Sequence, residues 1–462
     1  MEPLRPGLEL RRLLILAVPM IISQLGSMML GVVDMLMVGH VGVDALAAAA
    51  LGVLWTWGTM VMGMGLVFGI DPIVSQAHGA GAHEAFGRAV QRGIIIAALA
   101  SLPIGALWLQ TEDALLLAGQ EPALARMAHE YVQVQYPGLP AFLIYILLRQ
   151  SLQARGITSP AMWVVLFANL LNVALNAALI YGVSLGPLMI EPLGLRGAGI
   201  ATGLTRVTLV LALALWIWRG RLLADVWPPW RWREIASARG LGEILRHGVP
   251  LGLQFSFEMW AFQIATLLAG SLGAVALASH IVVLNLASLA FMVPLGISMA
   301  ATTRVGNLLG AGAPASAQRS AWVALALGGG VMTGSATLFI ALRGVLPRIY
   351  TADASVIAAA AALLPIAAAF QLFDGAQVVG AAILRAMGRT TVAASFHLVA
   401  FYGLALPLAY WLAFERGLGV PGLWWGLTLG LGVVAALFIT FVALRGPARA
   451  RALVHAETSS AP

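Results

Sequence analysis

The chain has 462 residues, of which 60% are hydrophobic and 10% are charged, with a mean hydropathy of +0.92 and a formal net charge of +7. Soluble domains carry about 25% charged residues, so this composition excludes an ordinary soluble protein and indicates a polytopic membrane protein. The chain has no cysteine and all of its 26 basic residues are arginine. These facts exclude disulfides, thiolate chemistry and a Schiff-base lysine.

Apolar runs of about 20 residues, separated by glycine, proline and charged residues, predict membrane-spanning helices. The runs lie at 13–38, 45–75, 93–111, 130–154, 160–181, 196–218, 246–269, 276–304, 320–342, 355–384, 392–413 and 421–444. The first run is too long for the apolar region of a cleavable signal peptide, so we expect it to remain as a helix. The sequence therefore predicts an all-α polytopic membrane protein with twelve transmembrane helices.

The arginines give the orientation of these helices. With a cytoplasmic amino terminus, 20 arginines fall on the cytoplasmic side, five fall outside, and Arg206 lies within the sixth span. The positive-inside rule then predicts that both termini are cytoplasmic. No basic run with interleaved aromatic residues is present, so we expect no nucleic-acid partner.

An internal repeat aligns the two halves of the chain at an offset of 231 residues. It pairs Pro19 with Pro250, and Gly79-Ala80-Gly81 with Gly310-Ala311-Gly312. Because each repeat holds six spans, an even number, the halves have the same orientation and should be related by a pseudo-twofold along the membrane normal. This arrangement is typical of alternating-access transporters.

The repeat also predicts the domain organisation. We expect an amino-terminal six-helix lobe at 1–218, a cytoplasmic linker at 219–245, a carboxy-terminal six-helix lobe at 246–445 and a cytoplasmic tail at 446–462. The linker contains Trp227, Trp230 and Trp232, which we expect at the membrane interface, where indole rings are favoured.

Acidic residues within the spans are the first candidates for function. Asp34, Glu258 and Asp374 lie well inside spans, and such residues by default mark ion or substrate pathways. The repeat does not copy them, since Asp34 aligns with Ala265. The alternative is a buried carboxyl group that only fixes packing, and for Asp71, which precedes a proline near the cytoplasmic end of the second span, we favour such a local role.

Asp34 should share a layer with other oxygen-bearing side chains. It lies near the outer end of the first span, Asn172 and Asn176 share a face at the outer end of the fifth, and Thr202 lies near the outer end of the sixth. This set suits Na⁺, or a carboxyl group that takes up a proton. The asparagines could equally serve only in hydrogen bonds between helices, and Asn169 lies off their shared face.

Glu258 and Asp374 lie near the centres of the seventh and tenth spans, and they form a second candidate cation and substrate site. Aromatic residues accompany them, namely Phe255, Phe257, Trp260, Phe370 and Phe373. Carboxylates with aromatic walls suit an organic cation, and Na⁺ is the candidate metal at this site as well. The alternative for the aromatic rings is the ordinary core of the helix bundle.

Pro19 cannot donate a backbone hydrogen bond, so it weakens the first helix and is a candidate hinge, although proline kinks are common in membrane helices. The eight histidines show no paired metal spacing, and no phosphate-binding GxxxxGK[ST] loop is present. We therefore expect neither an enzyme nor an ATP-driven pump, and no cofactor other than a coupling ion.

In these features the chain resembles the multidrug and toxic compound extrusion (MATE) family, and within it the NorM-like branch. The resemblance covers about residues 8 to 445. Besides Glu258 and Asp374, it is carried by "DMLMVGHVG" at 34–42, "SQAHGAG" at 75–81, "LRGAGIATG" at 195–203 and "NLLGAG" at 307–312. It implies two six-helix lobes around a V-shaped cavity and the export of cationic drugs in exchange for Na⁺ or H⁺.

The resemblance also implies roles for single residues. An amino-lobe cation site of the family is matched by Asp34, Asn172, Asn176 and Thr202, and a carboxy-lobe acidic pair is matched by Glu258 and Asp374. Some relatives carry an aspartate where this chain has Asn176, which leaves one carboxylate in the amino-lobe site. The choice between Na⁺ and H⁺ therefore stays open.

We accordingly expect a monomeric antiporter of the bacterial inner membrane that exports amphipathic organic cations. The alternative is a flippase for lipid-linked glycans from the wider superfamily, which would need a cationic cavity for pyrophosphate. Taking Arg206 as the only arginine within a span, we expect an acidic cavity instead. A membrane-embedded enzyme would need a nucleophile or metal motif, and a receptor would not need three buried acids.

Overall fold

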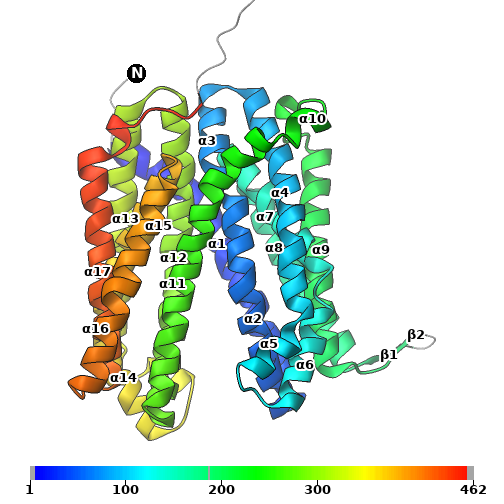
Figure 1. Ribbon diagram of the computed structural model, residues 1–462, viewed down its shortest axis with the longest axis vertical. Helices are drawn as coiled ribbons and strands as arrows, with labels where there is room; N and C mark the ends of the chain where they lie inside the picture. The colour runs from blue at the N-terminus through cyan, green and yellow to red at the C-terminus, as the bar shows by residue number, and fades with distance from the viewer. Residues whose placement is uncertain (1–5, 186–187, 455–462) are drawn as a thin grey trace, which may run out of the picture. The chain divides into compact units, whose positions relative to one another are not determined.

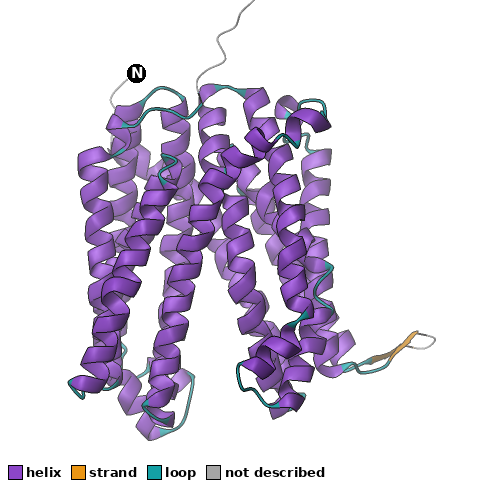
Figure 2. Cartoon of the chain, in the orientation of Figure 1, coloured by secondary structure: helices purple, strands orange, loops and turns teal. Residues whose placement is uncertain are grey.

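The computed structural model describes residues 6–185 and 188–454, and these residues are almost entirely helical (Figures 1 and 2). Helix is expected, because a chain in lipid must satisfy its backbone hydrogen bonds within itself. The α-helices are α1 Pro6–Gly39, α2 Val43–Phe68, α3 Asp71–Ala80, α4 His83–Leu109, α5 Thr111–Leu117, α6 Pro122–Gln133, α7 Gly138–Ala154, α8 Ser159–Ile180, α9 Gly194–Arg219, α10 Trp232–Ile235, α11 Ala238–Ser271, α12 Ala274–Gly310, α13 Pro314–Ala341, α14 Ala354–Ala386, α15 Thr390–Ala400, α16 Leu406–Tyr410 and α17 Val420–Arg445.

Shorter elements complete the described chain. The 3₁₀ turns are η1 Ala224–Val226, η2 Leu346–Ile349 and η5 Pro447–Arg449, and the π-helical turns are η3 Phe401–Ala405 and η4 Trp411–Glu415, which flank α16. The strands β1 Val183–Leu185 and β2 Leu188–Ile190 pair antiparallel between α8 and α9, and their hairpin projects beyond the end of α9 (Figure 1).

The twelve predicted spans all coincide with helices. Among the described residues, ten helices are long and apolar enough to cross a membrane, and the pair α6 and α7, bent by 54°, adds an eleventh. The remaining predicted span is α11, which has 34 residues and is less apolar because Gln254, Glu258 and Gln263 interrupt it. The chain is thus an all-α, multi-pass membrane protein, as predicted.

Equivalent turns confirm the internal repeat. Gly81 and Gly312 end matching helices with φ angles of 70° and 68°, and Gly156 and Gly388 do so with φ angles of 75° and 70°. Only glycine adopts this left-handed conformation without strain, which explains why these positions recur in both halves. The two halves therefore share their turn geometry as well as their sequence pattern.

The helices form two compact units. The carboxy unit holds the described residues up to Ile21, together with Asp71–Ala82 and the described residues from Leu253 onward. The amino unit holds Ile22–Ile70 and His83–Gly252. The described chain therefore passes between the units at both ends of Asp71–Ala82, and also within α1 and within α11, where the passage follows a proline by two residues. The predicted boundaries of the six-helix lobes differ from this division, and as lobe boundaries they stay a prediction.

In each proline-containing helix, the part before the passage packs into one unit and the rest into the other. Close glycine contacts hold the first part of each helix in its unit. In the amino unit a Cβ on Gly65 would overlap the backbone of Gly252 in α11. In the carboxy unit a Cβ on Gly296 would lie 2.8 Å from the backbone nitrogen of Ile21 in α1. The repeat offset relates these two contacts, so both halves use the same packing. The hydropathy pattern shows that these segments are apolar, but it does not predict which helix each of them packs against.

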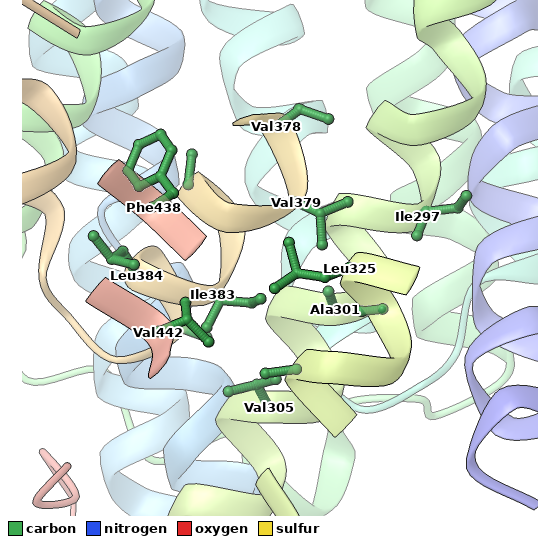
Figure 3. Close-up of a cluster of buried hydrophobic side chains, with 14 of the residues drawn as sticks. Ile297, Ala301, Val305, Leu325, Val378, Val379, Ile383, Leu384, Phe438 and Val442 are labelled. Carbon is green, nitrogen blue, oxygen red and sulfur yellow. The ribbon is translucent and has the colours of Figure 1, made fainter. Parts of the chain in front are cut away.

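Each unit has its own helix packing. In the amino unit α9 packs against α7 and α8, and α2 packs against α4 and α6. In the carboxy unit α14 packs against α12, α13 and α17, and Figure 3 shows apolar side chains of these four helices meeting in one cluster. Leu13 and Ala17 of α1 belong to the same cluster. These well-packed helices hold the intramembrane polar groups described below.

The predicted linker lies against the amino unit. Arg155, which follows α7, donates a bidentate pair of hydrogen bonds to Asp225 at 2.7 and 2.8 Å, and Arg88 forms an ion pair with Glu234 at 2.8 Å. Gln91 also donates to the backbone oxygen of Pro228 at 2.8 Å. The hydrogen bonds from Arg155 hold the pKa of Asp225 below its ordinary value. The interfacial position of the linker tryptophans stays a prediction.

Replacing Asp225 by asparagine is expected to lower the free energy of unfolding at neutral pH by up to about 1 kcal/mol, because the Asp225 side chain is about half exposed. A carboxyl group whose pKa is lower in the folded protein stabilises the fold at pH values above its pKa in the unfolded chain, which is near 4. This stabilisation is lost as the pH falls through the pKa of the folded protein. The melting temperature of Asp225→Asn should therefore lie below that of the wild type by a constant amount from about pH 5 to 8, because Asp225 takes up a proton only below about pH 4. In stronger acid this difference should disappear. A difference that does not shrink at all as the pH is lowered from about 5 into strong acid would contradict this account.

Candidate ion and substrate sites

The amino unit gathers its predicted polar residues around Asp34. The Asn176 amide donates to one carboxylate oxygen at 2.5 Å, and the Thr202 hydroxyl donates to the other at 2.7 Å. Asn176 also donates to the side-chain oxygen of Asn172 at 3.2 Å. Asp34, Asn172 and Asn176 are all buried. The layer predicted from helix depth is therefore present, while its binding of a cation stays a prediction.

Small residues allow these helices to approach. A Cβ on Gly197 of α9 would overlap the backbone oxygen of Leu179 in α8, so glycine is needed where the two helices cross. Asn169, which lies off the predicted face, instead donates to the backbone oxygen of Gly26 in α1 at 2.9 Å. That bond joins two helices, which is the structural role that we considered for the asparagines.

The carboxylate of Asp34 has uncharged hydrogen-bond donors on both oxygens. The side-chain oxygen of Asn176 is buried and has no hydrogen-bond partner among the described residues. A carboxylate beside a free amide oxygen is the kind of ligand set that a small hard cation takes. Thr205, which accepts a 3.5 Å hydrogen bond from Asn172, also belongs to this layer and was not predicted.

Arginine is more common inside the helices than predicted. Arg206 lies over the rings of Trp108 and Phe142, with its guanidinium carbon 5.6 and 5.5 Å from their centroids. Arg149 in α7 and Arg385 in α14 are buried as well. The prediction that Arg206 is the only arginine within a span is therefore wrong. The sequence count assigned both residues to the cytoplasmic side because they lie near the carboxy-terminal ends of their helices.

In the carboxy unit Glu258 is part of a hydrogen-bonded group. The Gln377 amide donates to Glu258 Oε1 at 3.1 Å, and the same nitrogen lies 2.8 Å from His397 Nε2. Asp374 lies one helical turn before Gln377 and interacts electrostatically with Glu258. The two predicted acids thus belong to one group of polar residues. The sequence reasoning missed Gln377 and His397, for which the only signal was two polar residues in otherwise apolar runs.

The aromatic residues near these acids have different surroundings. Phe370 is buried edge-on against Phe262 and Trp424, with ring centroids 5.9 and 5.7 Å apart, so it belongs to the bundle core. Phe257 packs against Tyr402 at 5.7 Å. Phe255 lies under Arg385, whose guanidinium carbon is 5.8 Å from the ring centroid. Phe373 and Trp260 are exposed, so they stay candidates for contact with a substrate.

Asp71 has a longer-range role than predicted. Its side chain is buried and forms an ion pair with Arg385 of α14 at 3.4 Å, within the carboxy unit. The expectation of a purely local residue is therefore wrong. Sequence reasoning could not pair these residues, because they lie 314 positions apart.

Pro19 lies inside α1, which continues as one helix to Gly39. Pro250 occupies the equivalent place inside α11. Both prolines precede the passage of their helix from one compact unit to the other by two residues. A bend at Pro19 during transport stays a prediction.

Comparisons with known proteins agree with this architecture. The MatE family model matches residues 19–178 and 250–411, which are the two halves of the repeat. A multidrug resistance protein NorM of Burkholderia vietnamiensis is 34% identical over 433 residues, which cover 91% of both chains. Multidrug and toxin extrusion protein 1 of Xenopus tropicalis is 34% identical over 95% of this chain and 74% of its own.

A solved structure gives the same result. The crystal structure of the eukaryotic MATE transporter AtDTX14 superposes with a TM-score of 0.87 at 26% identity, and the match covers 96% of this chain and 97% of that one. The repeat, the twelve spans and the sequence similarity over most of the chain all point the same way. The chain therefore belongs to the MatE family.

Proposed function

We propose that this protein is a secondary active multidrug efflux antiporter, which exports amphipathic organic cations in exchange for inward Na⁺ or H⁺ by alternating access. The observation that carries the proposal is the pair of acids, Glu258 and Asp374, held in one polar group inside the carboxy unit. Relatives at 34% identity that are named multidrug resistance and multidrug and toxin extrusion proteins support export of drugs. We place the protein, as a monomer, in a bacterial inner membrane with both termini in the cytoplasm.

Coupling follows from linkage between the sites. A cation entering from outside binds Asp34 or the pair of Glu258 and Asp374, and it favours a state with low affinity for the drug. The drug is then released outward, and by reciprocity the drug weakens binding of the cation. In this mechanism α1 bends at Pro19.

The test is ethidium efflux from proteoliposomes that contain the purified protein. A Na⁺ gradient and a pH gradient are imposed separately, and at least one of them should drive efflux above the rate of protein-free vesicles. Efflux that responds to neither gradient would overturn the antiporter proposal. Scrambling of a lipid-linked oligosaccharide in the same vesicles, without ethidium efflux, would instead support the flippase.

A further inference from the structure

Gln377 and His397 are buried polar residues that no step above uses. Gln377 lies in α14 and His397 in α15, and both side chains are almost fully inaccessible. At the repeat offset of 232 that applies to this part of the chain, their places are taken by Tyr145 and Val165. The group is therefore specific to the second half, as Glu258 and Asp374 are.

The hydrogen bonds fix the tautomer of His397. Its Nδ1 lies 3.0 Å from the backbone oxygen of Ala393, one turn earlier in α15. A carbonyl oxygen only accepts, so Nδ1 must carry the proton. In the neutral ring Nε2 is then an acceptor, and it faces the side-chain amide of Gln377 at 2.8 Å.

The same logic fixes the amide of Gln377. Its two neighbours, His397 Nε2 and the Glu258 carboxylate, both accept hydrogen bonds. Only the NH₂ end of the amide satisfies both of them, since a carbonyl oxygen in that place would face two acceptors. The carbonyl oxygen of Gln377 therefore points away from them, and it is buried without a hydrogen-bond partner among the described residues.

The surroundings of His397 hold this arrangement in place. The imidazole ring packs against Phe438 of α17 and Phe401 of η3, with centroid distances of 5.5 and 5.8 Å. Glu258 Oε2 lies 3.7 Å from His397 Nε2. Asp374 is on α14 one turn before Gln377. A buried acceptor left without a donor is unfavourable, so turning the Gln377 amide over would leave both His397 Nε2 and Glu258 Oε1 unsatisfied.

We infer that Gln377, oriented by His397, is a positioning residue that holds the Glu258 carboxylate in place at the candidate cation site of the carboxy unit. This inference rests on the proposed antiport for its transport readout, but not for its structural readout. The imidazole acts through the amide and does not itself touch the cation.

The structural readout is nitrogen NMR of the protein labelled with ¹⁵N-histidine, with His397→Gln used to assign the His397 signals. The wild type should show His397 as the neutral ring with the proton on Nδ1. A proton on Nε2 would reverse the direction of the hydrogen bond from Gln377 and overturn the inference. This measurement is independent of whether any gradient drives efflux, so it separates failure of the inference from failure of the proposed function.

The transport readout compares His397→Phe with His397→Gln. Phenylalanine keeps a ring but removes the acceptor, so the concentration of driving cation that gives half-maximal ethidium efflux should rise about tenfold, with little change in the maximal rate. Glutamine can still accept from Gln377, and it should restore most of the apparent affinity. Gln377→Leu should resemble His397→Phe, and the double variant should be no worse than either, because both remove one interaction.

His280 provides a matched control. It is another buried histidine of the carboxy unit, and it contacts Thr266 at 3.0 Å. His280→Phe should leave the apparent affinity for the driving cation unchanged. Equal apparent affinities for His280→Phe and His397→Phe, or additive losses in the double variant of Gln377 and His397, would show a purely structural role and overturn the inference.

Discussion

Gradient-driven ethidium efflux is expected to fall at least about a hundredfold when Glu258 is replaced by glutamine, Asp374 by asparagine, or Asp34 by asparagine. Each change keeps the size of the side chain and removes the charge that the coupling cation requires. The measurement is efflux from proteoliposomes under whichever gradient drives the wild type. Amount, monodispersity and melting temperature of each variant show whether the protein is still folded.

The control for this prediction is an acid outside the two sites. Asp44 lies exposed in the first turn of α2, and Asp44→Asn should transport like the wild type. Full drug resistance of cells that express each of the three amide variants would rule out the mechanism. Loss in only one unit would assign the coupling site to that unit.

Replacing Glu9 by alanine is expected to destabilise the carboxy unit by about 2 kcal/mol, because it removes the partner of a largely buried arginine. Arg304 of α12 donates to both carboxylate oxygens of Glu9 at 2.7 and 3.0 Å. Glu9 is 1% exposed, while Arg304 keeps 20% of its side chain exposed, which lowers the expected cost. The change should appear as a lower melting temperature followed by tryptophan fluorescence.

Two further variants make this measurement specific. Arg304→Met combined with Glu9→Ala should recover part of the loss, since no arginine is then left buried without its carboxylate. Arg231→Ala breaks an exposed pair with Glu234 and should change stability by less than about 0.5 kcal/mol. A Glu9→Ala variant as stable as Arg231→Ala would show that burial does not strengthen the Glu9 pair.

The sequence predicts most of the fold because long apolar runs and glycine turns are local features. Gly81 and Gly312 could be aligned from sequence alone, and both adopt the same left-handed turn. The exchange of segments between the compact units could not be predicted. Hydropathy shows that the residues around Gly252 and Ile21 are apolar, but it does not show which helix covers them.

In the candidate sites, too, the sequence predicts features that depend on depth within a helix, but not contacts between distant helices. Helix depth was enough to place Asn176 and Thr202 beside Asp34, since all three lie at the same level of long helices. The link between Glu258 and His397 depends on three helices and on the direction of one amide, which no spacing reveals. Likewise, nothing near Asp71 in the sequence points to Arg385.

One contact within the carboxy unit relates the two repeats directly. A Cβ on Gly79 of α3 would overlap the backbone oxygen of Asn307, and a Cβ on Gly310 of α12 would overlap that of Gln76. The offset of 231 pairs Gly79 with Gly310 and Gln76 with Asn307. The contact is therefore the same from either side when the two repeats are exchanged. Such a self-complementary contact is what joins identical subunits about a twofold axis. The glycine crossing in the carboxy unit therefore has the symmetry of an interface between two identical subunits, although a single chain forms both of its sides.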